Sequence, residues 1–113
     1  MTPHTVIYDV AAAREMLVAV KSKGEIKALL NVVEKLRALG EQLVPPHMKP
    51  LGGEGAAGLR ELRPRQGSSD WRLIYRRIGE RAYVILSVGT HDEFDKLVAR
   101  AQDRGRQYEG WRT

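Results

Sequence analysis

The stretch Gly58–His91 constrains the fold most, because it reads as three short β-strands joined by two turns. The turns are expected at residues 66–69 and at Gly79-Glu80. Side chains alternate between the two faces of a strand. In residues 71–77 this alternation puts Trp, Leu and Tyr on one face and Arg, Ile and Arg on the other. The sequence therefore predicts a small antiparallel sheet with an apolar face for helices and an opposite, basic face.

Positive charge is concentrated in the same stretch. It holds seven arginines and three acidic residues, namely Arg60, Arg63, Arg65, Arg72, Arg76, Arg77 and Arg81 against Glu61, Asp70 and Glu80. The whole chain has a formal net charge of +5 and a pI near 9.8. Such a balance favours a polyanionic partner, nucleic acid before an acidic protein. A basic protein without such a partner is the plain alternative.

Helices are predicted on both sides of this stretch. Apolar residues at helical spacing indicate a helix at about 10–21, with Asp9 as its N-cap, and a second from Ile26 to Leu39. Gly40 fits the position just after the second helix. After the last strand, Thr90 to Glu93 matches a capping box, which predicts a helix over about 91–107.

The remaining segments complete a single α+β domain over residues 1–113. Thr5–Tyr8 is β-prone, and residues 43–57, with three prolines and several glycines, are interpreted as a connector or a flexible loop. We expect a small antiparallel sheet of about four strands, an N-terminal helical hairpin packed on one face, and a C-terminal helix. A hydrophobic content of 42% and a charged content of 29% are ordinary for such a domain.

Several classes of protein are excluded or disfavoured by composition. The chain has no cysteine, which excludes disulfides, thiolate nucleophiles and cysteine-based metal sites. Its N-terminus lacks the pattern of a secretory signal, and no apolar run approaches the roughly 20 residues needed to cross a bilayer. We therefore expect a cytoplasmic protein without membrane contact.

The arginine-rich strands contain the groups that metal-free RNA cleavage requires. That reaction needs a proton acceptor for the 2′-hydroxyl, a proton donor for the leaving oxygen, and cations beside the phosphoryl oxygens. Arginine suits the last role because its planar fork pairs with phosphate and stays charged. Arg72 is the first candidate, with Arg63 and Arg76 next, and His91 is the candidate acid or base. The alternatives are solvated surface arginines and an ordinary polar residue in a first helical turn.

No metal or cofactor is predicted. The carboxylates that follow His91 are ordinary residues for the first turn of a helix, and no second histidine stands at ligand spacing. Gly52-Gly53-Glu54-Gly55 lacks the Lys-Ser/Thr of a phosphate-binding loop.

Four short motifs follow one another within residues 14–105. They are Lys49-Pro50-Leu51, Gly58-Leu59-Arg60-Glu61-Leu62-Arg63, Trp71-Arg72-Leu73-Ile74-Tyr75 and Ile85-Leu86-Ser87-Val88-Gly89. Their order and spacing resemble the RelE/ParE toxin superfamily, in its HigB or phage Gp49-like branch. The resemblance implies a RelE-like fold and the toxin of a type II toxin–antitoxin pair. It also implies metal-independent cleavage of mRNA on the ribosome. The implied partners are the ribosome, mRNA and an antitoxin from an adjacent gene, of helix-turn-helix type, with operator DNA bound only through the antitoxin complex.

The resemblance also implies roles for individual residues. By position, Arg72 contacts the scissile phosphate, Arg63 takes the place of a basic residue on the preceding strand, and His91 follows Val-Gly as a basic or polar residue does in the superfamily. These three are the catalytic candidates. The candidates for binding RNA or phosphate are Lys49, Arg60, Arg65, Arg76 and Arg77.

Two departures separate this chain from RelE. Glu61 stands where RelE often has a lysine, and the C-terminal tyrosine that RelE uses as a base has no counterpart in Phe94–Leu97. His91 would therefore have to carry more of the proton transfer. The departures keep a second function open, that of a ParE-like toxin that binds and poisons DNA gyrase without chemistry of its own. A third reading is a basic RNA-binding fold without toxicity.

Overall fold

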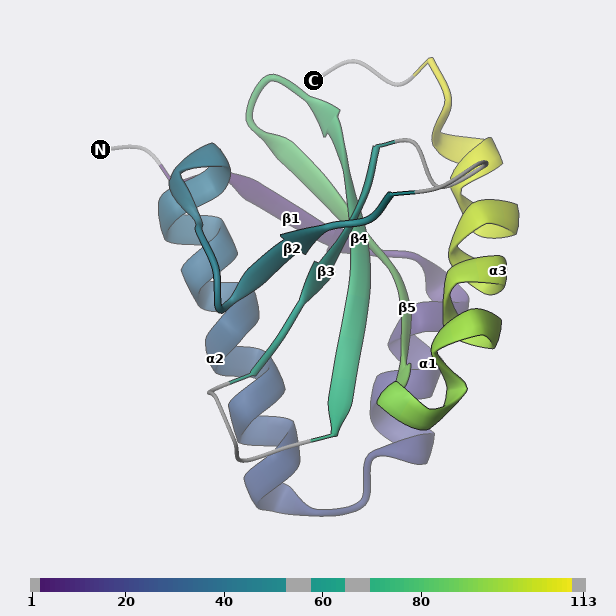
Figure 1. The fold of residues 1–113 in the computed structure, drawn as a ribbon. Coiled ribbons are helices and arrows are strands. Elements are labelled where there is room, and N and C mark those ends of the chain that lie inside the picture. Colours follow the sequence, from purple (N-terminus) through teal and green to yellow (C-terminus); the bar gives the residue numbers. More distant parts are fainter. Residues whose placement is uncertain (1–2, 53–57, 65–69, 111–113) are drawn as a thin grey trace.

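The computed structural model describes residues 3–52, 58–64 and 70–110. In them, five strands form one sheet in the order β1-β5-β4-β3-β2 (Figure 1). Neighbouring strands are antiparallel except β1, which runs parallel to β5. The strands are β1 Thr5–Tyr8, β2 Met48–Pro50, β3 Leu59–Leu62, β4 Trp71–Gly79 and β5 Ala82–Thr90.

Short-range signals predict where the first helix begins and where the second helix ends. The α-helices are α1 Val10–Ala19, α2 Lys23–Leu39 and α3 Phe94–Gly105, and the 3-10 turns are η1 Gly40–Gln42, η2 His91–Glu93 and η3 Arg106–Tyr108. The Asp9 carboxylate accepts from the backbone N–H groups of Ala11 and Ala12 at 3.0 and 3.4 Å, so the predicted cap of α1 is present. Gly40 ends α2 with a positive φ of 54°.

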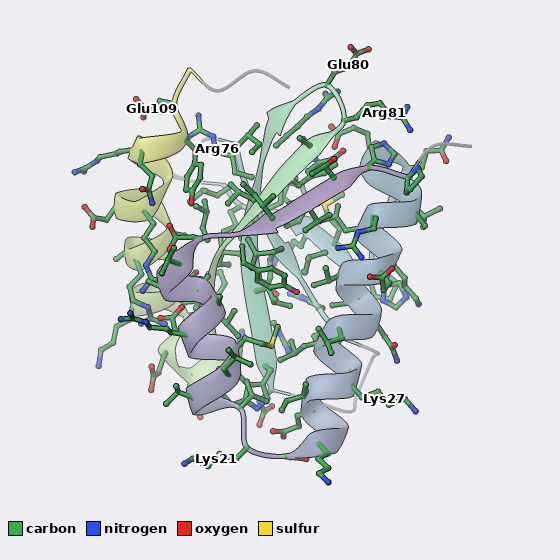
Figure 2. All side chains as sticks on the ribbon, turned by 180° about the vertical axis from the view of Figure 1, so that it is seen from behind. Lys21, Lys27, Arg76, Glu80, Arg81 and Glu109 are labelled. Carbon is green, nitrogen blue, oxygen red and sulfur yellow. The ribbon has the colours of Figure 1, made fainter. Side chains whose placement is uncertain are left out.

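Helices pack on both faces of the sheet. The buried core on one face joins α1 and α2 to the sheet through residues such as Met16, Leu36 and Tyr75. The core on the other face joins α3 to the sheet, with Leu97 packed in the same cluster as Ile74. Figure 2 shows α1 and α2 in front of the sheet, and Figure 1 shows the opposite side with α3 along the β5 edge. The predicted α+β architecture, with its helical hairpin on one face, is confirmed.

The face predicted to be basic differs from the expectation. Ile74, at its centre, is fully buried because α3 packs against it. α3 covers only the β5 side of this face (Figure 1). No helix among the described residues covers the side formed by β3 and β2. The basic surface is therefore confined to one part of the face.

Two local predictions need correction. The segment interpreted as a connector contains β2, which pairs with β3 and raises the strand count to five. The last helix begins at Phe94 rather than near residue 91, and the Thr90 side chain makes no capping hydrogen bond. Sheet pairing continues through Thr90, which pairs with Trp71, and the His91 N–H donates to the Asp70 carbonyl at 2.8 Å. The chain therefore leaves the sheet through a 3-10 turn.

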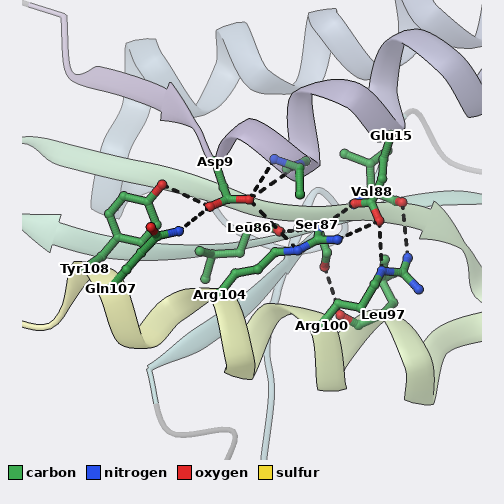
Figure 3. Close-up of polar contacts among 12 residues, drawn as sticks. Asp9, Glu15, Leu86, Ser87, Val88, Leu97, Arg100, Arg104, Gln107 and Tyr108 are labelled. Carbon is green, nitrogen blue, oxygen red and sulfur yellow. Dashed lines mark hydrogen bonds and ion pairs between the residues drawn. The ribbon is translucent and has the colours of Figure 1, made fainter.

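Side chains complete the outer edge of β5. The parallel strand β1 pairs only with the first half of β5, as far as Ile85. Beyond it, Glu15 of α1 accepts from the Val88 N–H at 3.0 Å, and Arg104 of α3 donates to the Leu86 carbonyl at 2.9 Å (Figure 3). These side chains supply hydrogen bonds that a further strand would otherwise make.

The same side chains bind one another, so they tie α1 to α3. Arg104 donates to both oxygens of Glu15 at 2.7 and 3.1 Å, and Arg100 pairs with Glu15 at 2.8 Å. Asp9 accepts from Gln107 at 2.6 Å and from the Tyr108 hydroxyl at 3.1 Å (Figure 3). We call Glu15, Arg100 and Arg104 the edge clamp.

Candidate functional site

Three predicted catalytic residues lie at one end of the sheet. The pairing of Trp71 with Thr90 shows that β4 begins where β5 ends, and β3 ends there as well. Arg63 directly follows β3, Arg72 is the second residue of β4, and His91 directly follows β5. Chain topology therefore brings together side chains that are up to 28 positions apart in the sequence.

A buried carboxylate holds two of them. Glu61 is only 2% exposed and pairs in register with Ile74, so it lies on the α3 side of the sheet. Its Oε1 accepts from Arg63 Nε at 2.6 Å and lies 3.3 Å from Arg72 Nε. The two guanidiniums carry two positive charges against one carboxylate, so this Glu61 cluster (Glu61, Arg63 and Arg72) retains a net charge of +1.

The backbone fixes the cluster further. Arg72 donates from Nη1 to the Trp71 carbonyl at 2.7 Å. The Arg63 N–H donates to the carbonyl of His47 at 2.8 Å, which joins the end of β3 to the residue before β2. His47, a polar residue of the predicted connector, also accepts a hydrogen bond at Nε2 from Lys35 Nζ at 3.0 Å. The start of β2 is thus held to α2 beside the cluster.

Lys49 and His91 flank the cluster. Lys49 of β2 is exposed and is the register partner of Glu61 on the neighbouring strand. His91 is also exposed, and its ring lies 6.0 Å from the Phe94 ring, centroid to centroid. An anion at this end of the sheet would meet two ordered guanidiniums, an ammonium group and an imidazole.

Two arginines predicted to bind phosphate lie elsewhere, on the α2 side. Arg60 is paired with Glu41, with a second hydrogen bond at 2.9 Å, and its guanidinium lies 5.9 Å from the centre of the Tyr75 ring. Arg77 lies 3.6 Å from the same carboxylate. Strand alternation sends these side chains away from Glu61, so they do not join its cluster. The hydrogen bond from Arg60 is the largest of the effects that together lower the pKa of Glu41 below its usual range.

Arg76, another predicted phosphate-binding residue, lies far from the Glu61 cluster. Arg76 lies on the α3 side, but its Nη1 is 3.7 Å from where a Cβ on Gly105 would stand, at the far end of α3. Four residues of strand separate it from Arg72, which corresponds to about 13 Å. Arg65 lies outside the described residues.

The sequence motifs did not predict that Glu61 would hold Arg63 and Arg72, and this residue was noted as a departure from RelE. The signal was present, because residues two apart on a strand share a face and Glu61 stands two before Arg63. No three histidine, aspartate or glutamate side chains gather to form a possible metal site within residues 3–52, 58–64 and 70–110. Over the same ranges, no helix is both long and apolar enough to cross a membrane.

Two solved structures share this fold, and both are toxins. A mutant of the E. coli toxin RelE in the free state gives a TM-score of 0.63 at 18% identity, covering 90% of this chain and 97% of that chain. A copper-bound mutant toxin from Helicobacter pylori gives 0.51 at 15% identity, covering 80% and 97%. No curated protein gives a significant sequence match. The model of the phage-derived Gp49-like family (DUF891) matches residues 17–107 of the 113, and the chain therefore belongs to this family, with the fold of the RelE-like toxin superfamily.

Proposed function

We propose that this protein is the toxin of a type II toxin–antitoxin pair and that it cleaves mRNA on the ribosome without a metal ion. Membership of the Gp49-like family and the RelE fold support the toxin role. The observation that carries the cleavage proposal is the Glu61 cluster, in which one buried carboxylate orients Arg63 and Arg72 at the end of the sheet beside His91.

Arg72 and Arg63 supply the cationic part of the site. Charge builds up on the phosphoryl oxygens as the 2′-oxygen attacks phosphorus and the 5′-oxygen leaves. Cations held in place before the reaction stabilise that charge, and losing one such group typically costs about 10²–10³-fold in rate. Arg72 is the better placed of the two, because its side chain is only 16% exposed whereas that of Arg63 is 35% exposed.

Proton transfer falls to His91. Its exposed imidazole stands at the turn that follows β5, next to the cluster in the sheet. An imidazole can take and return a proton in general acid–base catalysis, which is typically worth about 10²–10⁴-fold.

Cleavage of programmed ribosomes tests the proposal. Purified protein, ribosomes and message should give discrete cuts, mapped as new mRNA ends. Arg72→Ala should abolish them, and Arg72→Lys should reduce them because an ammonium group lacks the bidentate fork. Arg14→Ala is the matched control, since it removes an exposed positive charge on α1, away from the cluster. Intact message with the wild-type protein would refute cleavage.

The proposal also names partners. A toxin of this kind requires a cognate antitoxin, and we expect a small helix-turn-helix protein encoded by the adjacent reading frame. Operator DNA would be bound only by the toxin–antitoxin complex, and the site of action would be the cytoplasm, where ribosomes are. Induction of the toxin should stop growth, and co-expression of the neighbouring gene should restore it.

One observation favours the alternative, a ParE-like toxin that binds DNA gyrase. Glu61 offsets part of the charge that cleavage needs from Arg63 and Arg72. Gyrase-linked DNA breaks after induction, with mRNA ends unchanged, would favour this second function. The two outcomes separate cleanly when both are measured in the same induced culture.

A further inference from the structure

A cleft lies beside the Glu61 cluster, between β2 and α3. Its volume is about 380 Å³, at the lower end of the range of small-molecule pockets. Lys49 and Leu51 line one wall, and Phe94, Val98 and Gln102 of α3 line the other. The proposed cleavage chemistry assigns no role to these side chains.

The walls of the cleft suit a nucleobase. Leu51, Phe94 and Val98 are partly buried against the core under α3. This packing fixes the position of the apolar surfaces that they present to the cleft. Asp95 and Gln102, also in the lining, provide hydrogen-bonding groups. Unpaired RNA bases are bound in this way, through stacking on their faces and hydrogen bonds to their edges.

The position of the cleft links it to the cleavage site. Lys49 lines the cleft and is also the register partner of Glu61. Phe94 lines the cleft and has its ring 6.0 Å from that of His91. An RNA strand with a phosphate at the cluster would therefore bring a neighbouring nucleotide to the mouth of the cleft.

We propose that this cleft binds one unpaired base next to the scissile phosphate. Phe94 contacts the face of the base, Asp95 and Gln102 meet its edge, and Lys49 lies on the side of the phosphate. The inference rests on the proposed cleavage of RNA and adds to it a determinant of base preference. It assigns α3 a role in selecting the substrate as well as in covering the sheet.

Binding is tested first, without any cleavage. The four ribonucleoside 5′-monophosphates are titrated into ¹⁵N-labelled protein at millimolar concentrations, and amide shifts are followed by NMR. The amides of Leu51, Val98 and Gln102 should move, by different amounts for different bases. Ala99→Trp places an indole in the cleft from an exposed helix position and should weaken binding at least about fivefold, the lower range for losing one base stack. Leu17→Trp, which places the same indole at an exposed position of α1, should leave binding unchanged.

Cleavage is tested second, with ribosomes and a message of randomised codons. Gln102→Ala and Ala99→Trp should change which base stands beside the cut, whereas Leu17→Trp should cut as the wild type does. Nucleotide shifts absent from the cleft, or an unchanged base preference in both cleft variants, would overturn the inference while leaving cleavage intact. Cleft shifts without any cleavage by the wild type would instead overturn the proposed nuclease and retain the base-binding cleft.

Discussion

Replacing Glu15 by alanine should destabilise the protein by about 2–4 kcal/mol, because three donors lose their acceptor. The buried Val88 N–H would lose its 3.0 Å bond, and an unsatisfied buried donor costs about 1–3 kcal/mol. Arg104 and Arg100 would lose partners at 2.7 and 2.8 Å. Their side chains are 17% and 31% exposed, so water replaces part of what they lose and the total stays below the sum of the separate bonds.

Thermal unfolding gives the direct measurement. Unfolding entropy is about 2.1 cal/mol/K per residue, or about 0.24 kcal/mol/K for this chain, so the expected loss lowers Tm by about 8–17 °C. Glu15→Gln keeps an oxygen for Val88 and should cost less than Glu15→Ala. Arg14→Ala, at the neighbouring exposed position, should change stability by no more than about 0.5 kcal/mol.

A double-mutant cycle isolates the contact between the helices. Glu15→Ala and Arg104→Ala share the same hydrogen bonds, so their effects should be non-additive by about 0.5–3 kcal/mol. A Tm for Glu15→Ala within about 2 °C of the wild type, which is about 0.5 kcal/mol on the same scale, would show that the edge of β5 does not depend on the clamp.

Acid should weaken the edge clamp, because protonation removes the negative charge of Glu15. Burial alone would raise the pKa of Glu15, but hydrogen bonds from Arg104 and Val88 and the charges of Arg104 and Arg100 outweigh it, so the pKa lies below its usual value of 4.5. The carboxylate therefore contributes stability above the unfolded pKa and loses it as pH falls through the folded pKa. The stability difference between wild type and Glu15→Gln should shrink as the solution is acidified, and a difference that grew with acid would contradict the assigned charge.

Three further predictions concern other parts of the molecule. Gly40→Ala should destabilise the fold by about 1–3 kcal/mol in thermal melts, because φ is +54° and a Cβ would stand 2.3 Å from the His4 ring; an unchanged Tm would count against this geometry. Burial, reinforced by hydrogen bonds to carboxylates, raises the pKa of Tyr83 and of Tyr108 to about 12. Ultraviolet titration of the folded protein should therefore find both phenols neutral at pH 10. The free energy of unfolding should fall as the pH rises above 10, because these tyrosines lose protons more readily in the unfolded chain. Glu61→Gln should lower mRNA cleavage by about 10²-fold through misplaced guanidiniums, without weakening RNA binding, since the cluster gains positive charge; unchanged cleavage would refute its positioning role.

Local signals in the sequence were sufficient for the start of α1 and the end of α2. A cap such as Asp9 acts on amides two and three residues away, and Gly40 acts at the end of its own helix. Contacts of this range are contained in short segments, so spacing and residue type predict them. The capping box at Thr90 shows the limit, because pairing of Thr90 with Trp71 on another strand decides how the chain turns.

Long-range packing decides the features that the sequence does not predict. The pattern of β4 predicts two unlike faces, but it does not say that Leu97 and Ala101 of α3 will cover Ile74. β2 has only three residues, and it becomes a strand because β3 offers it an edge to pair with. Neither feature has a signal within its own segment.

The grouping of the arginines also depends on contacts between segments that are far apart in the sequence. A count of arginines places Arg60, Arg63, Arg72 and Arg77 on one basic surface, yet each pair faces its own carboxylate, Glu41 or Glu61. The Glu41 carboxylate also accepts from the Tyr83 hydroxyl at 2.9 Å. Glu41 therefore joins the turn η1, which follows α2, to the sheet, and we assign its two arginines to stability.

Glu61 differs from Glu41 because its partners, Arg63 and Arg72, lie at the end of the sheet where β4 begins. Removing the charge at either glutamate therefore separates the two roles. Glu41→Gln should lower Tm with cleavage per folded molecule retained, because its partners lie on the α2 side. Glu61→Gln should reduce cleavage out of proportion to any change in Tm, because its partners are the groups that would hold the phosphate. Equal effects of both variants on activity would mean that position on the sheet does not distinguish the two clusters, and the assignment of Arg72 to the reaction would then lose its structural basis.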